Sequence, residues 1–259
     1  MNWTAPFSEF EGRVVLVTGS STGIGAAVAK GFAACGAQVA LHAHKSMGEA
    51  EAVRDAIVGA GGAASLYRAD LTDPLAGGEL VDRVAESAGG LHILINNAGD
   101  TLSRRLMNEL TLSEYRLLLD LNFGSVFAAC RAALPVFRAQ SRGTIVNTSS
   151  ISARIGGSSG SILYAAAKSA VSTFTRGLAR ELAPEKFRVN AVAPGVIDTK
   201  IHRQHTTPEV LASFVDAIPL GRSGTPDECV GAYLFLASDR LASFVTGQVI
   251  EVNGGQLMA

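Results

Sequence analysis

Residues 13–25 read Arg-Val-Val-Leu-Val-Thr-Gly-Ser-Ser-Thr-Gly-Ile-Gly, and an alanine-rich segment follows from about Ala26 to Cys35. The run before the first glycine is short, β-branched and apolar, which is typical of a strand buried on both faces. Glycines at positions 19, 23 and 25 permit a tight turn, and the alanine-rich segment predicts a helix. Free N–H groups and the positive end of the helix dipole would then face a pyrophosphate. We therefore expect a dinucleotide site here; a plain turn is the alternative.

The sequence after the glycine loop argues for a dinucleotide rather than a nucleoside triphosphate as the ligand. No Gly-Lys-Ser/Thr sequence follows the loop, which argues against a nucleoside triphosphatase.

Further strands and helices alternate along the chain. We expect strands at 38–42, 64–69, 92–96, 144–148, 188–192 and 248–252, and helices at about 48–58, 74–87, 113–139, 161–182 and 226–238, with an irregular, partly helical lid at 198–216. This alternation predicts right-handed βαβ units and a parallel sheet covered by helices on both faces. No linker, repeat or low-complexity tract divides the chain. We expect one doubly wound α/β domain over residues 1–259, with a seven-stranded parallel sheet.

Charge and hydropathy argue against several classes of partner. The 259 residues carry a net charge of -1 without a basic block, which disfavours nucleic acid and anionic membranes as partners. Residues 1–11 lack a basic region followed by an apolar run, so no signal peptide is expected. The apolar segment 117–137 is interrupted by Asp120, Asn122 and Arg131. We interpret it as a core or interface helix rather than a membrane span.

The three cysteines, Cys35, Cys130 and Cys229, are far apart and odd in number. They form neither a disulfide framework nor a metal-ligand spacing, so no metal is expected. A reducing, cytoplasmic location is the simplest expectation.

Tyr164 and Lys168 are four residues apart in the segment predicted to be a helix. At that spacing the two side chains share one helix face, so the ammonium would favour the phenolate and lower the pKa of the tyrosine. A phenol tuned in this way can give or take a proton. An ordinary helical pair is the alternative for these two residues taken alone.

Six short motifs occur along the chain in an order that is more specific than any one of them alone. The chain contains, in sequence, Thr18-Gly19-x-x-x-Gly23-Ile24-Gly25, Asn96-Asn97-Ala98-Gly99, Asn122, Ser149-Ser150, Tyr164-x-x-x-Lys168 and Pro194-Gly195. It thereby resembles the short-chain dehydrogenase/reductase family from about Arg13 to its C-terminus, and looks most like the 3-oxoacyl-carrier-protein reductases and the sugar or polyol dehydrogenases. The resemblance implies a Rossmann-type domain and an NAD(P)-dependent oxidoreductase that acts on CH–OH groups.

The resemblance also implies catalytic roles. Tyr164 would be the general acid/base, and Lys168 would lower its pKa and contact the nicotinamide ribose. Ser150 would hydrogen-bond the substrate oxygen, and Asn122 would hold a water that links Lys168 to solvent. Negative charge develops on the carbonyl oxygen during hydride transfer, so donors must be aimed at that atom.

Two serines compete for the substrate role. The family serine usually precedes its tyrosine by thirteen residues, a position that Ile151 occupies here. We choose Ser150 because the family serine is commonly the second of a Ser-Ser pair, and a one-residue insertion between Ala153 and Ser161 would explain the offset. Ser149 is the alternative, and both serines could be plain strand-end hydrogen bonders.

Most of the site is expected to bind the cofactor. The implied contacts are Gly19, Ser21, Thr22, Gly23, Ile24, His44, Lys45, Asp70, Leu71, Asn97, Ala98, Gly99, Tyr164, Lys168, Pro194, Gly195, Ile197 and Thr199. Asp70 could instead cap a turn or helix, and the segment 97–99 could be a plain turn. Asp100 is read as a surface turn, with a substrate contact as the alternative.

The end of the second strand favours NADP(H), with NAD(H) possible. NAD-specific relatives place an aspartate there, whose carboxylate takes both ribose hydroxyls and would repel a 2′-phosphate. Ala43 occupies that position, Lys45 adds a positive charge, and His44 can donate a hydrogen bond. Thr22 favours NAD(H) instead, because NADP-dependent relatives often carry a basic residue at this position.

The expected function is reversible hydride transfer between NADP(H) or NAD(H) and a small secondary alcohol or ketone: a sugar, a polyol or a 3-oxoacyl compound. A catalytically silent NAD(P)-binding sensor on the same scaffold is the alternative. The apolar helix around residues 123–137 and the helix that carries Tyr164 predict a homotetramer, because these helices pair across a two-fold axis in the family.

Overall fold

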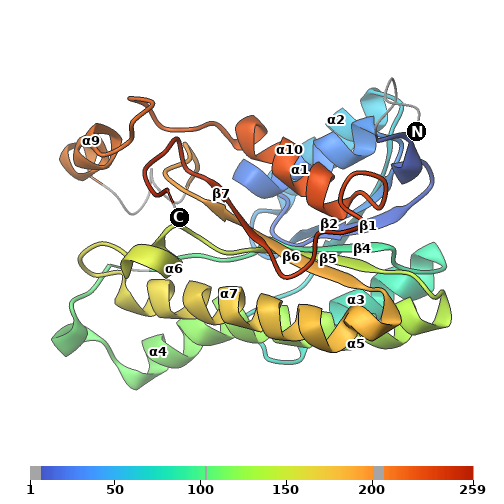
Figure 1. Ribbon diagram of the computed structural model, residues 1–259, viewed down its shortest axis with the longest axis horizontal. Coiled ribbons are helices and arrows are strands. Elements are labelled where there is room, and N and C mark those ends of the chain that lie inside the picture. Colours follow the sequence, from blue (N-terminus) through green and yellow to red (C-terminus); the bar gives the residue numbers. More distant parts are fainter. Residues whose placement is uncertain (1–6, 103, 201–206, 259) are drawn as a thin grey trace.

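Seven parallel strands form the centre of the computed structural model, which describes residues 7–102, 104–200 and 207–258 (Figure 1). The strands are β1 (Val14–Val17), β2 (Gln38–Ala43), β3 (Ala63–Arg68), β4 (Ile93–Asn96), β5 (Thr144–Thr148), β6 (Arg188–Pro194) and β7 (Val249–Val252). Their order across the sheet is β3-β2-β1-β4-β5-β6-β7, and all neighbouring pairs are parallel. The predicted seven-stranded parallel sheet is confirmed.

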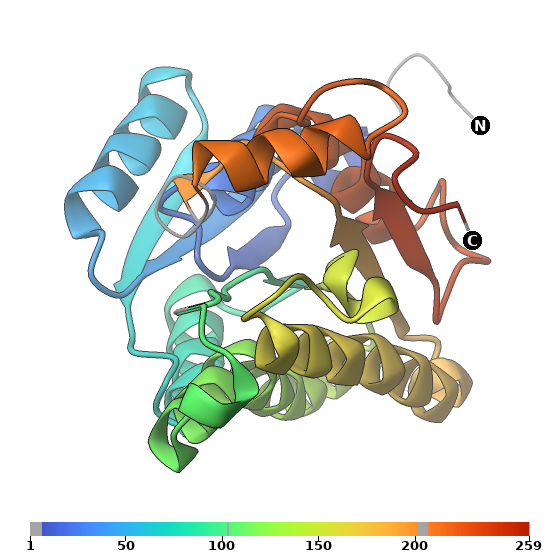
Figure 2. The same ribbon diagram turned by 90° about the vertical axis from the view of Figure 1, so that its left-hand side faces the viewer.

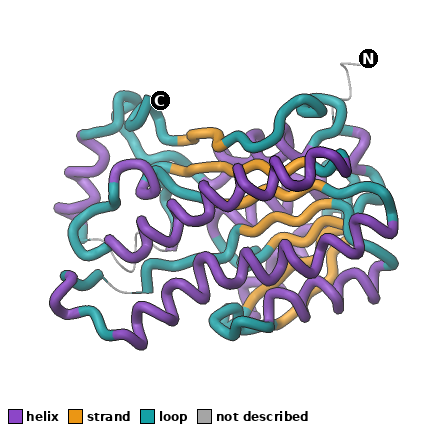
Figure 3. Tube along the Cα trace, turned by 60° about the horizontal axis from the view of Figure 1, so that its bottom comes forward, coloured by secondary structure: helices purple, strands orange, loops and turns teal. Residues whose placement is uncertain are grey.

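Helices cover both faces of the sheet. One layer holds α1 (Gly23–Ala34), α2 (Met47–Gly59) and α10 (Pro226–Ala237), and the other holds α3 (Ala76–Ala88), α4 (Leu112–Leu119), α5 (Ser125–Ala139) and α7 (Ile162–Leu182) (Figures 1 and 2). Figure 3 shows the strands running beneath the helices of the second layer. Shorter elements are α6 (Ser152–Ile155), α9 (Pro208–Asp216) and 3₁₀ turns at Ser8–Phe10, Met107–Glu109 and Ala183–Glu185.

The first strand shows why apolar residues run without alternation here. Val15 and Val17 belong to the core beneath α1 and α10, whereas Val14 and Leu16 belong to the core beneath α3, α5 and α7. All four side chains are buried. Because both faces of the strand are covered, each residue contributes roughly 1.5–3 kcal/mol of hydrophobic stabilisation, and a polar residue on either face would remain unsolvated.

The helix predicted over residues 113–139 is interrupted. A π-helical turn at Asp120–Gly124 separates α4 from α5. The side chain of Asn122 donates to the carbonyl of Leu118 at 2.9 Å, and the Ser125 hydroxyl donates to the carbonyl of Leu121 at 2.6 Å. Side chains that bond to backbone carbonyls compete with the regular helical ladder, and π-helical turns often occur at functional sites.

The segment Leu112–Ala139 is long and apolar enough to cross a membrane by length and composition, because an 18-residue window within it has a mean hydropathy of 1.4. In this protein its second half packs along α3, and its π-helical turn packs against α7. Val126, Ala129 and Ala133 lie in the core beneath the sheet. Its buried face therefore serves the fold, in line with the interpretation as a core or interface helix.

Candidate active site

A cleft of about 680 Å³ opens at the carboxyl ends of the strands. The sheet order reverses between β1 and β4, and ligands of open α/β sheets bind outside such a switch point. The lining includes all eighteen residues predicted to bind the cofactor, together with Ser150. Asn122 is the one predicted site residue outside that lining. Part of the predicted lid, residues 201–206, lies outside the described residues.

The glycine loop brings backbone close to the cleft. Gly19 and Gly23 have φ values of +63° and +56°, which favour glycine. A Cβ at Gly25 would lie 2.3 Å from the carbonyl oxygen of Gly19 and 2.5 Å from Nδ2 of Asn97. Because α1 begins at Gly23, its first N–H groups face the cleft.

Two polar side chains tie this loop to β4. The Thr18 hydroxyl accepts hydrogen bonds from the backbone N–H groups of Asn97 and Ala98, at 2.9 and 3.0 Å. The Asn97 amide donates to the carbonyls of Thr18 and Gly19, at 3.0 and 3.1 Å. Asn97 thus organises the two loops that meet at the switch point, which a plain turn would not do.

His42 is a site residue that the sequence reading missed. Its Nδ1 accepts from the N–H of Gly19 at 3.0 Å, so Nε2 carries the proton that bonds the carbonyl of Ala69 at 3.1 Å. Burial lowers the pKa of His42 to about 4 and keeps the ring neutral. The ring fixes the phosphate loop against the end of β3. The available signal was a polar residue inside an otherwise apolar buried strand.

The end of β2 carries no carboxylate. Ala43 is buried at that end, and His44 and Lys45 follow it along the cleft wall. Nδ1 of His44 lies 3.4 Å from a carboxylate oxygen of Asp70. Hydrogen bonds from Thr72 lower the pKa of Asp70, with a smaller contribution from the nearby His44 and Lys45 charges. Asp70 therefore makes the turn-capping contact that was the alternative for it, and it also lies in the cleft.

Tyr164, Ser150 and Lys168 come together at the other end of the cleft. Tyr164 and Lys168 lie on α7, and Ser150 follows β5. The Ser150 side chain is close enough to Tyr164 to act on the pKa of its phenol. Nζ of Lys168 lies 5.7 Å from the centroid of the Tyr164 ring and donates to the carbonyl of Thr148 at 2.9 Å. Burial lowers the pKa of Lys168 to about 8.

The pKa of Tyr164 differs from the sequence-based expectation. Burial raises it to about 12; the neighbouring Ser150 side chain opposes this shift, and the charge of Asp100 adds to it. The net pKa of Tyr164 therefore lies above its ordinary value, opposite to the direction predicted from the sequence. The reason is physical: the site is buried, and desolvation penalises the charged phenolate as it penalises the Lys168 ammonium.

The two serines have different partners. The Ser149 hydroxyl donates to the carbonyl of Lys168 at 3.1 Å and lies 2.6 Å from the Ser172 hydroxyl, so it is committed to α7. The Ser150 hydroxyl accepts from the N–H of Ser152 at 3.1 Å and meets Tyr164. The geometry favours Ser150 over Ser149 for the substrate role. Ser152 begins α6, a helical turn between β5 and α7 that the sequence analysis did not predict.

Asn122 holds the loop after β4 in place through hydrogen bonds to its backbone. It is fully buried, its amide donates to the carbonyl of Asp100 at 2.8 Å, and its Oδ1 accepts from the N–H of Asp100 at 3.1 Å. A Cβ at Gly99 would lie 2.6 Å from Oδ1 of Asn122 and 2.9 Å from Nζ of Lys168. Asn122 and Lys168 therefore converge on the loop after β4, and only glycine fits between them.

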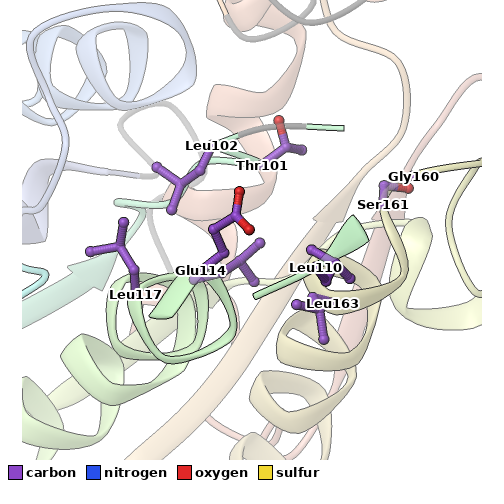
Figure 4. A pocket seen from close by; sticks show the side chains of 9 residues that line it. Thr101, Leu102, Leu110, Glu114, Leu117, Gly160, Ser161 and Leu163 are labelled. Atoms are coloured by element: carbon purple, nitrogen blue, oxygen red, sulfur yellow. The ribbon is translucent and has the colours of Figure 1, made fainter. Parts of the chain in front are cut away.

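A smaller pocket of about 290 Å³ adjoins the cleft and shares four lining residues with it. Figure 4 shows Glu114 between Leu102 and Leu117 on one side and Leu110 and Leu163 on the other. The carboxylate of Glu114 accepts from the N–H of Thr111 at 3.0 Å and pairs with Arg105 at 2.9 Å. Glu114 thus caps α4 and needs no ligand. The pocket contains none of the predicted catalytic or cofactor residues.

Comparisons with known proteins agree with this architecture. The family described as enoyl-(acyl carrier protein) reductase matches residues 19–256. The 3-oxoacyl-[acyl-carrier-protein] reductase FabG of Escherichia coli is 36% identical over 249 residues, which cover 96% of this chain and 99% of the relative. The 3beta-hydroxysteroid dehydrogenase 1 of Eggerthella lenta is 38% identical over 255 residues, with coverages of 97% and 96%.

Solved structures match over nearly the whole chain. A short-chain type dehydrogenase/reductase from Mycobacterium marinum superposes with a TM-score of 0.92 at 37% identity and covers 99% of both chains. A putative NAD(P)-dependent gluconate 5-dehydrogenase from Beutenbergia cavernae with bound NADP gives 0.91 at 36% identity, with coverages of 98% and 100%. The NADH-dependent reductase A1-R′ complexed with NAD gives 0.87 at 33% identity, with the same coverages.

Fold, cleft and relatives together define the class of protein. The chain belongs to the short-chain dehydrogenase/reductase family. It is an NAD(P)-dependent oxidoreductase that acts on alcohol or ketone groups.

Proposed function

We propose that this protein transfers a hydride between a nicotinamide dinucleotide and a small secondary alcohol or ketone, with Tyr164 as general acid/base. The observation that carries the proposal is the contact between Tyr164 and Ser150 in the cleft whose other end is the glycine loop. Two hydroxyl groups can thus be presented to one substrate oxygen.

The cleft residues fit a dinucleotide. Gly19 and Gly25 bring backbone against Ala98 and Asn97 so closely that no side chain could replace them, and the first turn of α1 offers N–H groups to a pyrophosphate. Asn97, Ala98 and Gly99 line the route from this loop to Lys168. When bound, the cofactor supplies or accepts the hydride, and the protein supplies orientation and the proton.

The protein residues control the proton. In ketone reduction Tyr164 gives its proton to the carbonyl oxygen while Ser150 donates a hydrogen bond to the same atom. In alcohol oxidation the phenolate removes the hydroxyl proton. The ammonium of Lys168, 5.7 Å from the ring, favours this phenolate. Asn122 holds the Asp100 backbone beside them.

NADP(H) is the preferred cofactor in this proposal. Ala43 places no carboxylate at the end of β2, and the side chains of His44 and Lys45 line the adjoining wall. A 2′-phosphate would therefore meet positive charge and hydrogen-bond donors rather than repulsion. We also propose a homotetramer, because apolar side chains remain exposed on α4, on α5 and near the C-terminus. The proposed location is the cytoplasm, because Cys35, Cys130 and Cys229 are free.

The experiment is a dehydrogenase screen across polyols, sugars, sugar acids and 3-oxoacyl thioesters with each cofactor, followed by Tyr164→Phe on the best substrate. We expect Tyr164→Phe to lower kcat by at least about 10²-fold while cofactor binding persists. Tyr115→Phe is the matched control, because Tyr115 is exposed on α4. A Tyr164→Phe variant within threefold of wild type would overturn the role of Tyr164, and cofactor binding without turnover of any substrate would favour the sensor.

A further inference from the structure

Arg104 lines the same cleft as Ser150 and Tyr164, at the end remote from the end of β2. The sequence analysis did not single it out, because it lies in an irregular stretch between β4 and α4. Burial lowers the pKa of its guanidinium. Arg104 therefore places a positively charged side chain on the lining that also holds Ser150 and Tyr164.

Two other walls of the cleft hold the Arg104 side chain in place. Its Nη1 donates to the Ser158 hydroxyl at 2.5 Å. Its Cζ lies 5.9 Å from the centroid of the Phe214 ring on α9, within the range of a cation–π interaction. Both partners also line the cleft. The guanidinium is therefore positioned where the loop after β4, the loop before α7 and the helix of the lid meet.

The backbone around Arg104 is adapted to this position. The N–H of Arg105 donates to the carbonyl of Gly160 at 3.1 Å. Gly160 has a φ of +75°, and a Cβ there would lie 3.0 Å from the carbonyl carbon of Arg104. Glycine at position 160 thus allows the two loops to touch, and this contact fixes the direction of the arginine.

Charge is distributed unevenly over the substrate end of the cleft. The carboxylate of Asp100 acts on Tyr164 and raises its pKa. Arg104 places the opposite charge on the same lining. Consider an anionic substrate whose reacting carbon lies at Tyr164. Asp100 would repel its negative group if that group lay next to Asp100, whereas Arg104 would attract the group if it lay next to Arg104.

We propose that Arg104 binds a carboxylate on the substrate and so makes the enzyme selective for hydroxy acids or keto acids. This inference rests on the proposed function, because it assigns one end of that substrate. A planar guanidinium matches a carboxylate with two parallel hydrogen bonds, which an ammonium cannot reproduce. The contact with Phe214 links this recognition to α9.

The test uses pairs of substrates that differ only in the charged group: D-gluconate against D-glucitol, and 3-hydroxybutyrate against its methyl ester. We expect wild type to favour the acid in at least one pair by tenfold or more in kcat/KM. Arg104→Gln should reduce that acid-to-neutral ratio at least tenfold, chiefly through KM, and Arg104→Lys should restore part of it.

Arg105→Gln is the matched control, because the neighbouring Arg105 pairs with Glu114 and does not line the cleft. It should keep the wild-type ratio. The inference fails if wild type favours the neutral member of both pairs, or if Arg104→Gln keeps the ratio. The ratio is measured within each variant, so a general loss of activity does not affect it. Failure of the proposed function looks different: wild type would turn over no compound of the whole dehydrogenase screen with either cofactor.

Discussion

Lys168 combines a positive charge with almost complete burial. Its side chain is 2% exposed, and its pKa falls to about 8 because the site desolvates the ammonium. The same desolvation raises the pKa of Tyr164 to about 12. The protein alone therefore keeps its phenol protonated at neutral pH, and each added positive charge near the ring brings the phenolate closer.

Removal of the Lys168 charge should move the pH dependence of alcohol oxidation. In Lys168→Ala the phenolate loses its nearby cation, the pKa of Tyr164 rises further, and the rate profile shifts to higher pH. Cofactor binding should also weaken. The measurement is kcat/KM against pH for both proteins, with Lys30→Ala as control because Lys30 is exposed on α1. A reduced rate with an unchanged pH profile would show that Lys168 does not tune Tyr164.

His42 predicts a pH dependence of stability. Its pKa is about 4 in the folded chain and about 6.5 when unfolded, so the unfolded chain binds the additional proton between these values. The contribution of His42 is complete above about pH 6.5 and is lost as the pH falls toward 4, by about 3 kcal/mol in total. Urea unfolding across this window should show a shallower slope in His42→Asn; equal slopes for both proteins would contradict the assignment.

At the scale of elements, the strands and most helices could be predicted because each depends on local pattern. The apolar run of β1 and the glycines after it needed no knowledge of distant residues. The π-helical turn and α6 could not be predicted in this way. The helix is irregular at Asn122 because the side-chain amide of Asn122 hydrogen-bonds the backbone N–H and carbonyl of Asp100, twenty-two residues away in the sequence. Arg104 and His42 likewise act through partners that only the tertiary structure supplies.

The end of β2 should decide the choice of cofactor. Wild type is expected to favour NADP(H), and Ala43→Asp should invert the preference, because its carboxylate would bond the ribose hydroxyls and repel a 2′-phosphate. One such charge-assisted contact is worth about 1.5–3 kcal/mol, or roughly ten- to a hundredfold in kcat/KM. The check is kcat/KM with both cofactors, with Ala43→Ser as an uncharged control. A wild type that already favours NAD(H) would show that Lys45 does not reach the phosphate.

At the scale of the molecule, the parallel sheet brings residues from distant segments to one edge. The glycine loop follows β1, Asn97 follows β4, Ser150 follows β5 and Pro194 ends β6, and all of them line one cleft. The chemistry is thus assembled by strand order, while the outer faces of the helices remain available for other contacts.

Two separate groups of apolar side chains remain exposed. The first lies on α4 and α5, where Leu117 is 42% and Phe127 is 49% exposed, and Phe127 packs edge-on against Phe174 of α7. The second includes Leu220, Phe244 and Met258, each at least 70% exposed, in the C-terminal part of the chain. Exposed apolar side chains can mark interaction sites, and two separate two-fold interfaces on one chain would generate a closed tetramer.

The protein should therefore be a homotetramer whose two interfaces can be broken one at a time. Phe127→Glu places a charge in the first interface and Phe244→Glu in the second, and each should yield a dimer, since burial of an unpaired carboxylate is costly. Light scattering coupled to gel filtration at micromolar concentration gives the masses. Val58→Glu serves as control, because Val58 is 54% exposed on α2, away from both groups. A wild-type monomer would refute the assembly, and a tetramer that survives both charged variants would place its interfaces elsewhere on the molecule.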